Sequence, residues 1–219
     1  MIKTVEQKPN LYEPLKGIKV IEVAQGVAGP HCGKILAGLG AEVLKVEIPP
    51  EGDWSRKFGP KLPTDETLES SALFLHNNTG KKSILIDWRS PKGLSELQNL
   101  TKNADVFIED WDLNTRNNLN LPKDFFIKQN QRLIEICITP FGLSGPYSLY
   151  KATPMIIFAL SGFMNIMGAP SKKPIMLPGF QADYCTGING NNAVQIALWE
   201  RDLKTQKGKF LELSMLETL

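Results

Sequence analysis

Cysteine and histidine are scarce in this sequence. Its 219 residues include three cysteines, Cys32, Cys137 and Cys185, with no CxxC spacing, and two histidines, His31 and His76. A zinc site needs several well-spaced nitrogen or sulfur ligands, and so few residues do not supply them. We therefore expect no metal site.

Long apolar runs and clusters of basic charge are also missing. No apolar run approaches the ~20 residues that a membrane-spanning helix needs. The opening MIKTVEQKPN is polar, unlike a signal peptide. The formal net charge is only +2 and the basic residues are scattered, so nothing suggests a nucleic-acid partner. We expect a cytoplasmic protein that binds neither membrane nor nucleic acid.

What the sequence does contain is ordinary for a globular enzyme. Hydrophobic residues make up 42% and charged residues 22%, and a chain of this length can bury a substantial core. Residues 1–16 form a polar lead-in, and residues 17–219 are expected to form one α/β domain.

The opening of that domain has the pattern of a parallel β-α-β unit. GIKVIEVA (17–24) is a short, β-branched strand pattern, HCGKILAGLG (31–40) has helical character, and AEVLKVE (41–47) is a second strand. Two strands joined through a helix run parallel.

Alternating strand and helix patterns continue to the end of the chain. Ser90 and Pro91 are the cap and first-turn residues of a predicted helix over 90–104, and residues 48–67 are expected to be a long exposed loop. Further strands are predicted over 83–87, 105–110 and 132–139, helices over 122–130, 154–167 and 190–205, and a strand running into a helix over 209–216. The sequence thus predicts a Rossmann-like, mostly parallel sheet with flanking helices.

The first turn invites comparison with a dinucleotide site, because Glu47 follows Gly26 at about the distance of a ribose-binding acid. However, Gly26, Gly29 and Gly33 form GxxGxxxG rather than GxGxxG. NAD binding is therefore a weak hypothesis. The glycines can simply let the chain turn at the sheet edge, or the turn can contact another ligand.

Several segments in order resemble the family III CoA-transferases. These are LKGIKVIEVAQGVAGPHCGKILAGLGAEVLKVEIPPEGDWSR (15–56), GKKSILIDWRSPKGLSELQNLTKNADVFIED (80–110), ITPFGLSGPY (138–147), ALSGFMNIMGAP (159–170) and QADYCTGINGNNAVQIALWERDLKTQKGKFLELSMLET (181–218). Each piece alone is weak, but their order and spacing together are specific.

The resemblance implies a CoA-transferase that exchanges coenzyme A between an acyl-CoA and a free carboxylate, with no permanently bound cofactor. Asp183 stands where the family has its nucleophile, and a helix starting near Cys185–Gly187 would stabilise its charge. From chemistry alone Asp183 is more simply a helix N-cap. Cys185 is a weaker rival nucleophile, because no histidine lies nearby in sequence to activate it.

The resemblance also implies where coenzyme A is held. The positions carried over are the turn of Gln25, Gly26, Val27 and Ala28, the pair Lys81 and Lys82, and Asp110, with Arg116 close enough to replace a missing family residue. The lysines alone would equally suit a solvated strand start.

The chain departs from the family pattern in two further ways. Thr153 and Pro154 replace the usual acidic or His-containing pair, which disfavours an acyl-CoA racemase, because that chemistry needs a base on each face. Family members are longer and form an interlocked homodimer, so we expect a fragment, inactive alone or limited to binding CoA.

Overall fold

A computed structural model describes residues 12–62, 67 and 69–219, so most of the polar lead-in lies outside it. The described part holds a six-stranded sheet in the order β3-β2-β1-β4-β5-β6, with every neighbouring pair parallel. This order is that of doubly wound dinucleotide-binding folds. The prediction of a Rossmann-like parallel sheet is confirmed.

The strands are short and mostly buried. They are β1 (Lys19–Glu22), β2 (Glu42–Glu47), β3 (Lys82–Leu85), β4 (Val106–Glu109), β5 (Ile134–Thr139) and β6 (Phe210–Ser214). Central strands β4 and β5 are buried along their whole length, because helices cover both faces of a parallel sheet.

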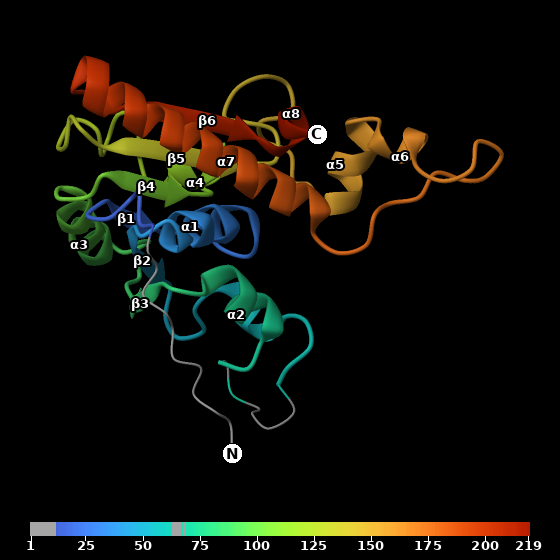
Figure 1. Cartoon of the computed structure of the whole chain (residues 1–219), viewed down its shortest axis with the longest axis horizontal. Coiled ribbons are helices and arrows are strands. Elements are labelled where there is room, and N and C mark those ends of the chain that lie inside the picture. The colour runs from blue at the N-terminus through green and yellow to red at the C-terminus, as the bar shows by residue number, and fades with distance from the viewer. Residues whose placement is uncertain (1–11, 63–66, 68) are drawn as a thin grey trace.

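Two helices cover one face of the sheet. Helices α1 (Ala28–Gly38) and α7 (Gln181–Glu200) lie side by side in front of the strands in Figure 1. Their apolar residues, among them Cys32, Leu36 and Val194, share a core with β1, β4 and β5. Helix α3 (Pro91–Thr101) packs on the other face, where Leu97 joins a second core with Phe107.

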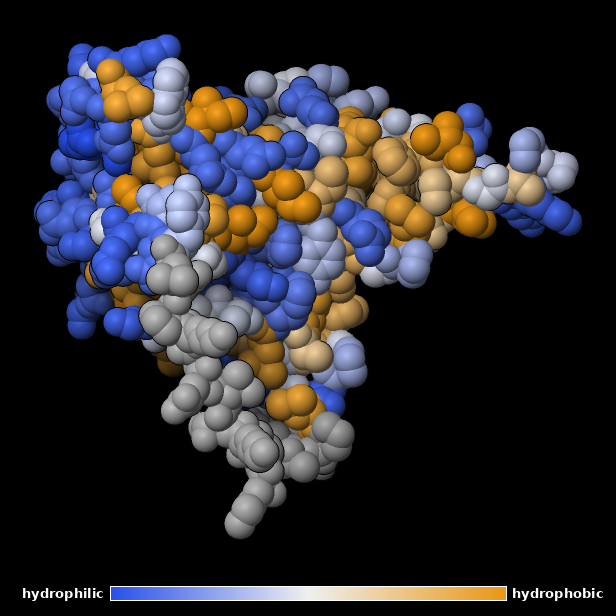
Figure 2. All heavy atoms as spheres, viewed as in Figure 1, coloured by the Kyte–Doolittle hydropathy of each residue, from blue (hydrophilic) through white to orange (hydrophobic). Residues whose placement is uncertain are grey.

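Shorter helices complete the described chain. They are η1 (Trp54–Lys57, 3₁₀), α2 (Ala72–Asn78), α4 (Leu113–Asn118), α5 (Pro154–Leu160), α6 (Phe163–Ile166), a π-helical turn η2 (Arg201–Thr205) and α8 (Met215–Thr218). In Figure 1, α5, α6 and the chain leading into α7 project from the body of the molecule. Apolar side chains are visible on this arm in Figure 2, and Met155, Leu160 and Ile166 are exposed there.

Two predicted helices were misplaced. Residues 123–129 form turns rather than a helix, and the helix lies earlier, at α4, where the Asp112 side chain accepts a hydrogen bond from the Thr115 amide. The predicted helix 154–167 is two helices, because Gly162 adopts a left-handed φ of 80° between them.

Two further predictions need correction. The sequence predicted helix starts near Cys185–Gly187 and at position 190, whereas helix α7 begins at Gln181. It continues through Gly187 and Gly190, which pack against neighbouring elements and do not break the helix. The 48–67 segment is not simply an exposed loop, since Asp53, Ser55 and Arg56 are buried. Residues 63–66 of that segment lie outside the described part.

The packing of α1 on the sheet requires a glycine at position 33. A Cβ there would overlap the Glu22 carboxylate, which is fully buried and fixed by Lys81. Gly38, in the last turn of the same helix, has open space around it. We expect Gly33→Ala to lower the free energy of unfolding by ~1–3 kcal/mol through overpacking.

The matched control is Gly38→Ala, which should be neutral or stabilise by up to ~1 kcal/mol, because alanine is the better helix former. Urea unfolding followed by circular dichroism measures both. Equal midpoints for the two variants would contradict this account of the α1–sheet contact.

Candidate active site

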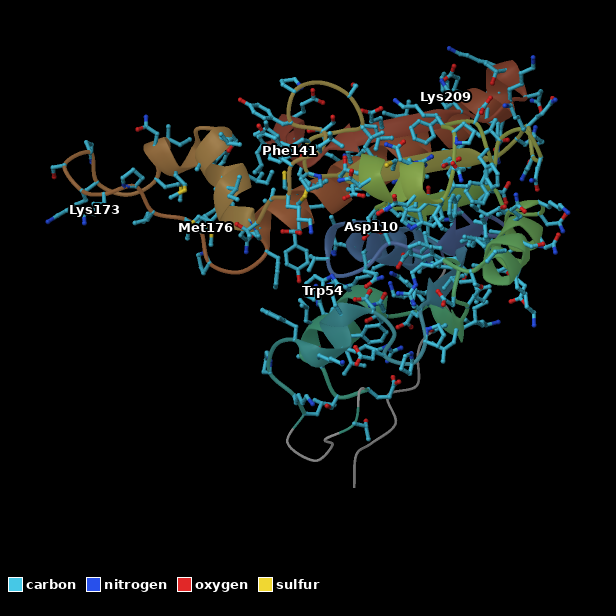
Figure 3. All side chains as sticks on the ribbon, turned by 180° about the vertical axis from the view of Figure 1, so that it is seen from behind. Trp54, Asp110, Phe141, Lys173, Met176 and Lys209 are labelled. Atoms are coloured by element: carbon cyan, nitrogen blue, oxygen red, sulfur yellow. The ribbon has the colours of Figure 1, made fainter. Side chains whose placement is uncertain are left out.

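The site lies at the carboxyl-terminal edge of the sheet, where parallel α/β folds bind their ligands. The loops after β1, β2 and β4 meet there. Figure 3 shows Trp54, Asp110 and Phe141 along this edge, on the side of the projecting arm.

A buried ion network organises this edge. The Lys45 ammonium lies 3.0 Å from Glu22 Oε1 and 2.8 Å from Asp53 Oδ2, and it donates to the Ala24 carbonyl oxygen at 2.8 Å. All three charged side chains are almost completely buried. Burial by itself would lower the pKa of Lys45, but Glu22 and Asp53 outweigh it and the pKa is raised. The ammonium therefore stays charged.

The network continues to the turn after β1. The Gly26 amide donates to both oxygens of Asp53, at 2.9 and 3.0 Å, and the Gln25 amide donates to Asp110 Oδ2 at 2.9 Å. Although burial raises it, the pKa of Asp53 is lowered overall, chiefly by Lys45. The carboxylate that holds the Gly26 amide is thus ionised.

These contacts weaken the dinucleotide hypothesis. In a dinucleotide fold the amides of the first turn bind the pyrophosphate, but here the amides of Gln25 and Gly26 already bind protein carboxylates. Glu47, the position of a ribose-binding acid, instead accepts two hydrogen bonds from Arg56, at 2.7 and 2.8 Å. The fold has the dinucleotide strand order, but two amides of its first turn are bound within the protein.

Gly26 also accommodates an aromatic ring. Its φ is 77°, and a Cβ at this position would overlap the Trp54 indole. Trp54 in turn lies 5.9 Å from Phe58 and 6.0 Å from Phe180, measured between ring centroids, and Phe180 is the N-cap of α7. This aromatic cluster connects the β1 turn to the start of α7.

Asp183 lies in the first turn of α7, close to that same turn. Gly187, one helical turn later on the same face, packs on α1, since a Cβ there would lie 2.7 Å from the Ala28 carbonyl oxygen. The structure therefore brings Asp183 and the Gln25–Ala28 turn to one place, although they are far apart in sequence.

The Asp183 carboxyl is half-buried, and its Oδ2 has no hydrogen-bond partner among the described residues. Burial raises its pKa from 3.8 to about 6, opposed by its own backbone amide. At neutral pH the carboxylate is mainly ionised, yet it is poorly solvated. Such a carboxylate is a better nucleophile than an exposed one.

The other predicted CoA contacts are dispersed. Lys81 is buried, with its ammonium 2.8 Å from Glu22 Oε2 and 2.7 Å from the Pro30 carbonyl oxygen. Arg116 is buried between Glu109 and Glu135. Both cations face protein carboxylates in the interior. Asp110 is half-buried, and the burial of its carboxyl raises its pKa to about 7.

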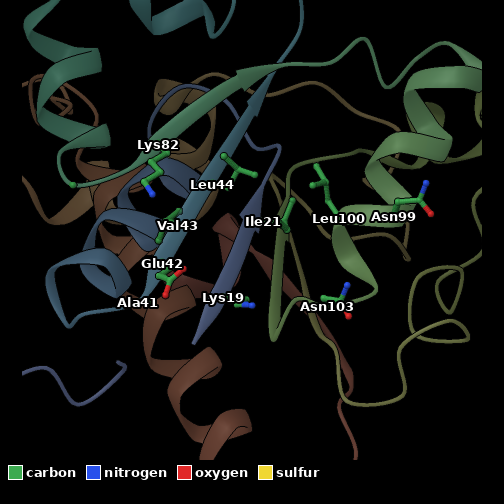
Figure 4. A pocket seen from close by; sticks show the side chains of 11 residues that line it. Lys19, Ile21, Ala41, Glu42, Val43, Leu44, Lys82, Asn99, Leu100 and Asn103 are labelled. Carbon is green, nitrogen blue, oxygen red and sulfur yellow. The ribbon is translucent and has the colours of Figure 1, made fainter. Parts of the chain in front are cut away.

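Lys82 is exposed at the amino-terminal end of β3, away from the edge that holds Asp183. It borders a cavity of about 480 Å³ between the starts of β1–β3 and α3, shown in Figure 4. No residue of α7 or of the Gln25–Ala28 turn lines this cavity, so it is separate from the candidate active site.

Sequence reasoning missed the residues that shape the turn, namely Lys45, Asp53 and Trp54. The sequence does contain an indication of them. Glu22 and Lys45 are charged residues inside otherwise apolar strand patterns, which predicts a charged pair in the interior. Among the described residues, no group of histidine, cysteine and acidic side chains is arranged to hold a metal ion, and no helix is apolar and long enough to cross a membrane.

The family model described as CoA-transferase family III matches residues 15–219, and the chain belongs to this family. It is 36% identical over 211 residues to the succinate–glutarate CoA-transferase of Agrobacterium fabrum, an alignment covering 95% of this chain and 52% of the relative.

Two further comparisons agree. The beta subunit of the succinyl-CoA–L-malate CoA-transferase of Chloroflexus aurantiacus is 33% identical, over 94% of this chain and 50% of that protein. A crystal structure of a CAIB/BAIF family protein from Brucella suis superposes with a TM-score of 0.86 at 35% identity, over 94% of this chain and 54% of that one. The chain spans about half the length of the relatives it matches.

The ion network should be essential to stability. Lys45→Met leaves the Asp53 carboxylate buried without its counter-charge and leaves Glu22 paired with Lys81 alone. Breaking a buried ion pair in this way typically costs ~3–5 kcal/mol. Urea unfolding measures the loss. The matched control is Lys128→Met, because Lys128 pairs with Asp124 on the surface, where ion pairs contribute only ~0–1 kcal/mol. A Lys45→Met protein as stable as the control would disprove the role of the network.

Proposed function

We propose that the protein transfers coenzyme A between an acyl-CoA and a free carboxylic acid, with Asp183 as the nucleophile. The observation that carries this proposal is the position of Asp183: a half-buried carboxylate with an unpartnered oxygen, in the first turn of α7, beside the Gln25–Ala28 turn. Membership of CoA-transferase family III supports it.

The proposed reaction proceeds through covalent intermediates on Asp183. Its carboxylate oxygen attacks the thioester carbon, the carbon–sulfur bond breaks, and a mixed anhydride and CoA thiolate form. The thiolate then attacks the Asp183 carbonyl carbon, releasing the first carboxylate and leaving an aspartyl-CoA thioester. The acceptor carboxylate repeats the two steps in reverse, which regenerates Asp183 and yields the new acyl-CoA.

The start of α7 can stabilise the charges that develop. The first amides of a helix lack intrahelical partners and carry partial positive charge. Asp183 lies among them, so they can stabilise both its carboxylate and the oxyanion of each tetrahedral intermediate.

We place coenzyme A in the cavity beside the β1 turn. This cavity, of about 370 Å³, is lined by Gln25, Trp54, Lys57 and Arg89 and by the chain from Ile48 to Asp53. It offers two cations for phosphates and an indole for the adenine ring. Arg89 and Lys57 thus replace Lys81 and Arg116 as phosphate contacts in this proposal.

The relatives suggest the substrate class. The proteins from Agrobacterium fabrum and Chloroflexus aurantiacus are named for succinate, glutarate and malate, all of which are dicarboxylic acids. We propose a dicarboxylate as the acyl group here. Assembly into a homodimer, suggested by the family resemblance, also belongs to this proposal.

Asp183→Asn tests the nucleophile. An amide cannot form the anhydride, so we expect CoA exchange to fall at least ~10³-fold while the unfolding midpoint changes little. Hydroxylamine added during turnover should convert Asp183 to a hydroxamate, detectable by mass spectrometry. Asp124→Asn, on the surface, is the control. Full exchange by Asp183→Asn would disprove this mechanism.

The rate should fall in acid because Asp183 must be ionised to attack. Its pKa is raised from 3.8 to about 6, so protonation removes the nucleophile as the pH falls through about 6. We expect kcat/KM measured between about pH 5 and pH 8 to be half-maximal near pH 6. A profile that stays flat down to about pH 5 would show that Asp183 keeps an ordinary pKa.

A further inference from the structure

Helices α1 and α2 bring nitrogen-bearing side chains together against α7, the helix that carries Asp183. Tyr184, the residue after Asp183, contacts His31 of α1 and His76 of α2 edge-on, with ring centroids 4.9 and 5.9 Å apart. The two imidazoles are stacked at 6.2 Å. Lys34, one turn after His31 on α1, places its ammonium 3.4 Å from Nδ1 and 3.3 Å from Nε2 of His76.

Lys34 differs from the other cations in this part of the molecule. Lys45, Arg56, Lys57 and Lys81 each form an ion pair of 3.0 Å or less with a carboxylate. Within residues 12–62, 67 and 69–219, Lys34 forms no ion pair. Its ammonium contacts an imidazole, which leaves N–H groups free to donate elsewhere.

The histidines do not compete with Lys34 for an anion. Burial, and then the nearby Lys34 charge, lowers the pKa of His31 and of His76 below 6.5. Both rings are therefore mainly neutral at pH 7, so Lys34 supplies the positive charge and the rings supply N–H donors. Together they suit a carboxylate, for which charge-assisted hydrogen bonds are the strongest recognition.

We infer that Lys34, His31 and His76 form a binding site for the far carboxylate of a dicarboxylic acyl group whose near carbonyl is attacked by Asp183. The inference rests on the proposed function in taking that carboxylate to be part of the substrate. Lys34 would then select dicarboxylic over monocarboxylic acids, because its ammonium pairs with a second carboxylate that a monocarboxylic acid lacks.

The chain offers a direct probe, because His31 and His76 are its only histidines. Each imidazole signal in an NMR spectrum of the 219-residue protein therefore reports on this site. Glutarate and pentanoate have the same five-carbon chain and differ in one carboxylate. Each is titrated at pH 7, with sodium chloride matching the ionic strength.

We expect glutarate to shift both imidazole signals saturably and pentanoate to leave them nearly unchanged. Lys34→Met should weaken the glutarate response about tenfold or more, the usual loss for one charged hydrogen-bond donor. Lys92→Met is the control, since Lys92 is exposed on α3, and should respond as the unmodified protein does. Equal responses to the two acids, or an unchanged response in Lys34→Met, would overturn the inference.

CoA exchange with glutaryl-CoA and pentanoyl-CoA separates this inference from the proposed function. A glutarate-selective imidazole response without any exchange refutes transfer by the 219-residue chain, which is then limited to binding, and retains the carboxylate site. Exchange in which Lys34→Met leaves the glutaryl-to-pentanoyl ratio of kcat/KM unchanged retains the function and refutes the selectivity. A fall in that ratio, with pentanoyl transfer preserved, supports both.

Discussion

The rest of the site depends on one buried ammonium, that of Lys45. It bridges Glu22 at the end of β1 and Asp53 in the segment after β2. Lys81 also pairs with Glu22, so the network holds two positive and two negative charges. Buried charges are tolerable only as such a compensated set, because an isolated one would lose several kcal/mol of hydration. The set fixes Asp53, and Asp53 fixes the Gly26 amide. A distant strand residue thereby sets the conformation of the turn that borders Asp183.

The same contacts explain how a dinucleotide-type sheet can serve another ligand. The strand order provides a switch point at the carboxyl-terminal edge, where β1 separates its neighbours β2 and β4. In this chain the amides of the turn there are bound to Asp53 and Asp110, and Trp54 lies against Gly26. The turn is therefore fixed by contacts within the protein, which suits the proposed role of this edge in binding a ligand other than a dinucleotide.

The environment of Asp183 differs from that of the paired carboxyls nearby. Asp53 and Glu47 each have a cationic partner, which lowers the pKa of both carboxyls despite burial. Asp183 is half-buried and has no cationic partner among the described residues, and its pKa rises to about 6. Such an unpaired carboxyl with a raised pKa suits the nucleophilic role that we propose for it.

The sequence alone determined the parallel α/β fold and most of its strands, because those follow from local periodicity and ordered motifs. It predicted a helix start near Cys185–Gly187, whereas α7 begins at Gln181 and includes Asp183 in its first turn. The helix predicted over 122–130 does not form. The nearby helix is α4, which begins after the Asp112 cap, ten residues before the predicted start. Only the tertiary structure decided which charges are buried and paired within the protein. Lys81 and Arg116 resemble phosphate contacts in sequence, yet folding buries them against Glu22, Glu109 and Glu135, since long-range pairing and burial leave no mark on local pattern.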